Sequence, residues 1–149
     1  MKSAIEYFIP AAIRNGAVNE YYRGRILVVS SATATVFLVI FAITRGLLDG
    51  LWAEETITLM LCIVITVSSP FLYRFSHSIV FTGLYLILGT MIALMFFAFV
   101  DGGFHSTSML WFPILPLFSV FFSGLRYGVI IAAVLVLYLV FLVLAHQMG

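Results

Sequence analysis

Long apolar runs separated by short polar breaks are the dominant pattern along this chain. Five such runs occur, at residues 26–44, 56–73, 78–100, 108–125 and 127–145. None of them contains Asp, Glu, Lys or Arg. A helix needs about 20 apolar residues to cross a hydrocarbon core of about 30 Å, so each run has spanning length or nearly so.

The same runs predict helices rather than strands. A strand of a membrane barrel alternates apolar and polar residues, whereas residues 129–137 are continuously apolar. Backbone groups in lipid must also find their hydrogen bonds within the segment, as they do in a helix. The pattern therefore predicts an all-α, polytopic bundle of five transmembrane helices at residues 26–149.

Composition strengthens this prediction. Of the 149 residues, 64% are hydrophobic and 9% are charged, whereas soluble domains carry about 25% charged residues. A soluble domain and a disordered tail are excluded, and a net charge of +1 provides no basic surface for nucleic acid. The single cysteine, Cys62, can form neither an internal disulfide nor a cysteine-based zinc site.

The distribution of basic residues predicts the orientation. If the N-terminus is cytoplasmic, Arg45 is the one basic residue outside, and the inside holds Lys2, Arg14, Arg23, Arg25, Arg74 and Arg126. Five spans then leave the C-terminus outside. Residues 1–25 mix apolar and charged positions, so we expect a cytoplasmic segment that rests partly on the membrane surface and is broken at Pro10 and Gly16.

The break between the third and fourth runs is the candidate ligand site. Two glycines there permit a tight turn, and two prolines in the next run disfavour a straight helix. A recess at the outer mouth would hold a small apolar ligand among Asp101, Gly102, Gly103, His105, Ser106, Trp111, Pro113 and Pro116. An ordinary turn with a serine cap at Ser106 or Ser108 is the alternative. Two possible metal ligands, Asp101 and His105, are too few to indicate a metal site.

Small residues inside the spans predict close helix packing. The small-xxx-small pattern occurs three times, at Ser30 and Ala34, Gly89 and Ala93, and Gly128 and Ala132. No span carries a mid-membrane charge of the kind used by proton pumps or ion-coupled transporters. We find no nucleophile arrangement or phosphate-binding loop, and therefore expect no catalytic residue, no metal and no cofactor in this chain.

Several short motifs resemble the membrane input domain of bacterial signalling proteins, which precedes a histidine kinase, a diguanylate cyclase or a class III adenylyl cyclase. The similar stretches are residues 19–25, the loop 70–75, the Gly-Gly-x-x-Ser turn at 102–106, residues 111–116 and the loop 124–128. That family has six spans, whereas this sequence shows five. The resemblance implies a location in the bacterial cytoplasmic membrane and a homodimer formed through the helices.

The resemblance also implies a sensor or regulatory role, most often for a histidine kinase, with catalysis outside this chain. Two alternatives stay open. The chain can be a small stand-alone membrane protein that serves as a transporter subunit for an uncharged substrate. It can also be an assembly or scaffold subunit.

Overall fold

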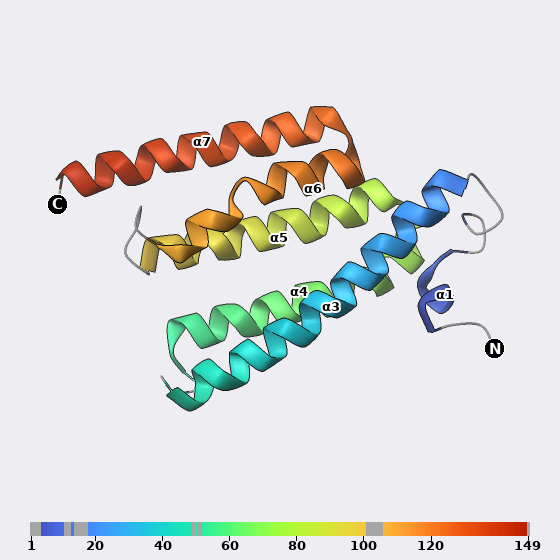
Figure 1. The fold of residues 1–149 in the computed structure, drawn as a ribbon, viewed down its shortest axis with the longest axis horizontal. Helices are drawn as coiled ribbons and strands as arrows, with labels where there is room; N and C mark the ends of the chain where they lie inside the picture. Colours follow the sequence, from blue (N-terminus) through green and yellow to red (C-terminus); the bar gives the residue numbers. More distant parts are fainter. Residues whose placement is uncertain are drawn as a thin grey trace. The chain divides into compact units, whose positions relative to one another are not determined.

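The computed structural model describes residues 4–10, 13, 18–48, 50, 52–100 and 106–148, and in these residues the chain is all-α (Figure 1). Regular structure consists of α1 (Ala4–Phe8), α3 (Val18–Leu48), α4 (Glu54–Ser76), α5 (Ile79–Val100), the 3-10 helix η2 (Thr107–Trp111), α6 (Ile114–Ser123) and α7 (Leu125–Met148). The predicted helical fold class is therefore confirmed.

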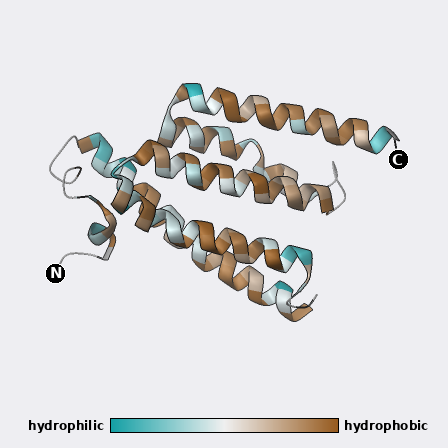
Figure 2. Cartoon of the chain, turned by 180° about the vertical axis from the view of Figure 1, so that it is seen from behind, coloured by the Kyte–Doolittle hydropathy of each residue, from teal (hydrophilic) through white to brown (hydrophobic). Residues whose placement is uncertain are grey.

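Four of these helices, α3, α4, α5 and α7, are long and apolar enough to cross a membrane. Figure 2 shows that hydrophobic residues dominate their lengths, while hydrophilic residues gather toward helix ends. Chains with such helices place them in a lipid bilayer. The protein is therefore a helical membrane protein.

The fourth apolar run differs from its prediction as a single span at 108–125. It is divided into η2, a turn at Phe112 and Pro113, and the ten-residue helix α6. Proline explains the division, because Pro113 and Pro116 lack the N–H groups that a continuous helix would use. Pro116 is tolerated where it stands because it lies in the first turn of α6.

The first membrane-spanning helix, α3, also begins earlier than the apolar pattern predicts. Helix α3 starts at Val18 rather than near residue 26, so part of the predicted surface segment continues directly into the span. Hydropathy indicates where the apolar part of a helix begins. The helix itself can extend beyond that part into a polar stretch, as α3 does over residues 18–25. Pro10 follows the short helix α1, as expected, and Gly16 lies outside the described residues.

The chain divides into two compact units, residues 1–86 and 87–149, with the boundary inside α5. In the first unit α3 and α4 pack side by side as an antiparallel pair (Figure 1). Gly50, in the connection between them, adopts φ of 97°, a backbone conformation that glycine tolerates best. Beyond it, Arg45 and Glu55 join the two helix ends through an ion pair of 3.1 Å.

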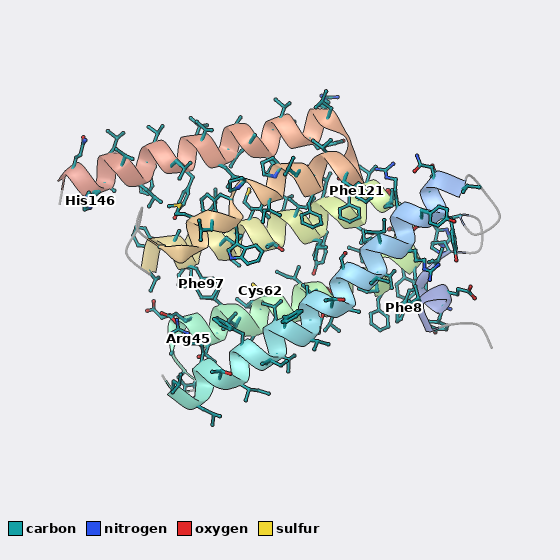
Figure 3. All side chains as sticks on the ribbon, in the orientation of Figure 1. Phe8, Arg45, Cys62, Phe97, Phe121 and His146 are labelled. Carbon is teal, nitrogen blue, oxygen red and sulfur yellow. The ribbon has the colours of Figure 1, made fainter. Side chains whose placement is uncertain are left out.

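At the opposite end of this pair, α1 packs against α3 and α4. The rings of Phe8 and Phe71 meet edge to face, with 5.1 Å between their centroids. The Arg74 guanidinium lies 3.7 Å from the centre of the Tyr7 ring and donates a hydrogen bond to the Tyr7 carbonyl. Figure 3 shows Phe8 and Arg45 at opposite ends of this unit.

The second unit contains the α6–α7 hairpin, in which a single residue, Gly124, connects the two helices. Gly124 adopts φ of 96° and ψ of 168°, and its N–H donates to the Val120 carbonyl over 3.0 Å. Gly128, one turn into α7, lies directly against α6, because a Cβ there would sit 2.2 Å from a Val120 methyl carbon. Two glycines thus let these helices pack closely from their first turn.

Candidate functional site

The interrupted stretch between α5 and α6 holds the candidate site predicted from the sequence. Four of its residues, Asp101, Gly102, Gly103 and His105, lie outside the described residues. The other four are described. Ser106 is buried, Trp111 is 58% exposed, Pro113 is exposed and Pro116 is half-buried. The turn at Phe112 and Pro113, between η2 and α6, is called the break below. The Trp111 side chain, which comes just before this turn, points outward.

The Phe112 side chain is buried, unlike that of its neighbour Trp111. It is 4% exposed and lies against Tyr138 of α7, with 5.9 Å between ring centroids and 44° between ring planes. The turn that carries it is closed by two backbone hydrogen bonds, from Phe112 N–H to Met109 and from Leu115 N–H to Phe112. Phe112 thus points inward, onto α7, whereas Trp111, just before it, points outward.

Tyr138 is the residue that the sequence analysis missed. Its hydroxyl donates a hydrogen bond to the Met95 carbonyl of α5, so one side chain joins α5, α7 and the break. A signal for it existed in the sequence, because a tyrosine in the middle of an apolar run needs a partner for its hydroxyl. Nothing in the sequence indicated which helix would supply that partner.

Two hydroxyl pairs cross the α3–α4 interface. Ser31 and Ser69 are fully buried and their oxygens lie 2.8 Å apart. The Thr35 hydroxyl lies 3.0 Å from that of Thr66. Each hydroxyl also lies within hydrogen-bonding distance of a main-chain carbonyl of its own helix, as serine and threonine often do in apolar helices. These side chains serve packing between helices.

The small-xxx-small positions are placed differently from one another. Gly128 contacts α6, and Ala93 in α5 is buried. Gly89 and Ala132 are half-buried.

Ser30 and Ala34 line an open groove that is formed by residues of α3 alone. Leu27, Val28 and Ser31, which lie within three residues of Ser30, are buried. The spacing pattern at Ser30 and Ala34 therefore did not identify the face of α3 that meets α4.

The described residues offer few groups for catalysis or metal binding. Among them, no three His, Cys, Asp or Glu side chains come together as a metal site. Cys62 is buried in the middle of α4 (Figure 3).

No family model matches the sequence, and no curated protein or solved structure is found to be similar to it.

Proposed function

We propose that this chain is the membrane-embedded sensor or regulatory domain of a bacterial signal-transduction protein, with a histidine kinase as the expected effector. The chain lies in the bacterial cytoplasmic membrane and carries no catalytic residue of its own. The observation that carries the proposal is the contact between the break and the last helix, where Phe112 meets Tyr138. A structural change at the break is thereby passed directly to α7.

The physical requirement for sensing is a stimulus that favours one helix packing over another. A small apolar ligand or a change in the bilayer would act at the outward-facing Trp111 and the turn beside it. Movement of Phe112 would then disturb Tyr138, whose hydroxyl is tied to the Met95 carbonyl. Because α5 and α7 share that hydrogen bond, the input changes how the two helices are held together.

Charge placement supports a regulatory role over ion-coupled transport. Such transporters keep ionisable residues within the membrane, along the path of the ion. The apolar runs of this chain contain no Asp, Glu, Lys or Arg. A regulatory domain needs no such residue, because its output is a change of packing.

The first test is the intact mass of the product expressed from its native locus. The chain has a mass of 16.6 kDa. A product far above this value, with a kinase or cyclase sequence attached, is expected. A product of 16.6 kDa would overturn the proposal of a covalently attached input domain, and would favour the stand-alone transporter or scaffold subunit.

The second test changes the coupling contact in that full-length product. Tyr138→Phe keeps the ring against Phe112 but removes the hydrogen bond to Met95, so effector output should change while membrane abundance stays constant. Tyr127→Phe, the same chemical change in the first turn of α7, is the matched control. Trp111→Ala should also alter output, with the exposed Trp52→Ala as its control. Unchanged output in both test variants would contradict the mechanism.

A further inference from the structure

An open groove of about 600 Å³ runs along one face of α3. Its lining includes Ile26, Val29, Thr33 and Phe37, which recur every three or four residues and therefore share one helix face. The face that packs against α4 is a different one, since it carries the Ser31 and Thr35 hydroxyls bonded to that helix. The groove is therefore available to a molecule from outside the α3–α4 pair.

The groove has a polar end and an apolar length. Tyr22 and Arg25 line it near the start of α3, and both side chains are exposed. Further along, the small side chains of Ser30 and Ala34 provide depth, and the large ring of Phe37 stands beyond them. The Ser30 hydroxyl donates to the Leu27 carbonyl of its own helix, so it presents no unsatisfied donor to the groove.

Its length matches one leaflet of a bilayer. Twelve residue steps separate Arg25 from Phe37, which is about 18 Å at 1.5 Å per residue. Half of a 30 Å hydrocarbon core is about 15 Å. An acyl chain that starts at the level of Arg25 would therefore run beside Ser30 and Ala34 and end near Phe37.

The positive charge of Arg25 at the polar end of the groove favours an anionic lipid headgroup. The described residues place no ion-pair partner at Arg25, in contrast to Arg45, which is bonded to Glu55. A guanidinium group binds phosphate oxygens strongly and in a defined geometry. Tyrosine is favoured beside it, because its ring and hydroxyl suit the boundary between lipid and water.

From these features we infer that the groove on α3 binds one anionic phospholipid of the leaflet next to the N-terminal end of α3. The phosphate pairs with Arg25 beside the Tyr22 hydroxyl. One acyl chain lies along the small side chains of Ser30, Thr33 and Ala34. This inference concerns residues 22–37 and does not depend on the proposed sensor role.

The test is native mass spectrometry of the full chain in detergent, with phosphatidylglycerol and phosphatidylcholine of identical acyl chains. The wild type should retain phosphatidylglycerol preferentially. Arg25→Gln should lower that retention about five-fold, since one basic residue near an anionic headgroup contributes about that factor. Arg25→Lys should retain part of the preference. Arg126→Gln, which removes an exposed arginine at the start of α7, should leave it unchanged.

Filling the groove gives an independent readout. Ala34→Phe should reduce retention of both lipids, and Thr33→Leu should do so more weakly. Ala133→Phe, at an exposed position of α7, adds the same bulk elsewhere and should have no effect. Helix content by circular dichroism and a single elution peak verify folding of each variant.

Three results would overturn the inference. Equal losses for Arg25→Gln and Arg126→Gln would show a diffuse charge effect rather than a site. Unchanged retention in folded Ala34→Phe would show that lipid does not occupy the groove. A wild-type dimer that Ala34→Phe converts to a monomer, with lipid retention unchanged, would show that a second copy of the chain covers this face.

Discussion

At Gly24, the backbone of α3 lies directly against the Tyr73 side chain of α4. A Cβ at Gly24 would lie 2.2 Å from the Tyr73 hydroxyl oxygen and 2.8 Å from the ring carbon that bears it. Tyr73 is fully buried, and among the described residues its hydroxyl has no hydrogen-bond partner. The contact therefore combines a steric limit at Gly24 with an unsatisfied polar atom at Tyr73.

These two features predict opposite effects of two substitutions. Gly24→Ala should lower the free energy of unfolding by about 1–3 kcal/mol, because the added methyl group overpacks the site. Tyr73→Phe should leave it unchanged or raise it by about 1–2 kcal/mol, because it removes a buried hydroxyl without a partner. Equilibrium unfolding of detergent-solubilised protein in a denaturing detergent measures both effects.

The double variant tests the cause. If the hydroxyl oxygen creates the clash, Gly24→Ala should lower the free energy of unfolding by less in the Tyr73→Phe background than in the wild type. The ring carbon at 2.8 Å would still prevent full recovery. Strictly additive effects would show that the strain at Gly24 arises elsewhere.

At the scale of helices, Pro70 gives a reason for the serine at position 69, which is paired with Ser31 across the α3–α4 interface. A residue with an N–H at 70 would donate it to the Thr66 carbonyl, and proline cannot. The Ser69 hydroxyl lies 3.0 Å from that carbonyl and can replace the lost bond, while it also lies 2.8 Å from Ser31 across the interface. The backbone hydrogen bond that α4 lacks at Pro70 is thus replaced by a side chain that also joins α4 to α3.

Coupling between Ser31 and Ser69 should be measurable but small. Interhelical hydrogen bonds in membrane proteins contribute about 0.6 kcal/mol on average and about 1.7 kcal/mol at most. A double-mutant cycle with Ser31→Ala and Ser69→Ala should give a coupling free energy in this range. The same cycle with Ser31→Ala and Ser68→Ala is the control, because Ser68 bonds Tyr85 instead. Coupling no larger than in the control would contradict a stabilising hydrogen bond between the two serines.

The one-residue connection between α6 and α7 should tolerate only glycine. The combination of φ 96° and ψ 168° at Gly124 costs other residues about 1–3 kcal/mol. Gly124→Ala should therefore lower thermal stability in detergent. Gly124→Asn should not restore it, because asparagine favours the left-handed helical region, where ψ is near 47°. Wild-type stability of Gly124→Ala would mean that the turn adopts another conformation.

The sequence predicted the helices better than it predicted their partners. Apolar runs located α4, α5 and α7 closely, because burial in lipid requires unbroken apolar length. Pro113 and Pro116 indicated an interruption, but not that Phe112 would turn inward while Trp111 turns outward. The pattern at Ser30 and Ala34 indicated a small-residue face, yet neighbouring Ser31 makes the contact with α4. Which face of a helix meets another depends on side chains from distant segments, and local spacing does not contain that information.

At the scale of the whole molecule, the number of membrane crossings depends on the interrupted segment. Helix α6 has ten residues and is about 15 Å long, and η2 adds five residues and about 10 Å. With the turn between them, the segment approaches the thickness of a hydrocarbon core of about 30 Å. We therefore expect it to cross, which places the two ends of the chain on opposite sides of the membrane.

Labelling of single cysteines with a membrane-impermeant maleimide tests this topology in intact cells. In a Cys62→Ala background, Trp52→Cys and Gln147→Cys should react from outside, and His77→Cys only after permeabilisation. All three positions are exposed in the structure, so differences in reaction report sidedness rather than burial. If Gln147→Cys reacted only after permeabilisation while Trp52→Cys reacted from outside, residues 107–123 would enter and leave on one side. The C-terminus would then lie in the cytoplasm, on the side where an attached effector could act without a further span.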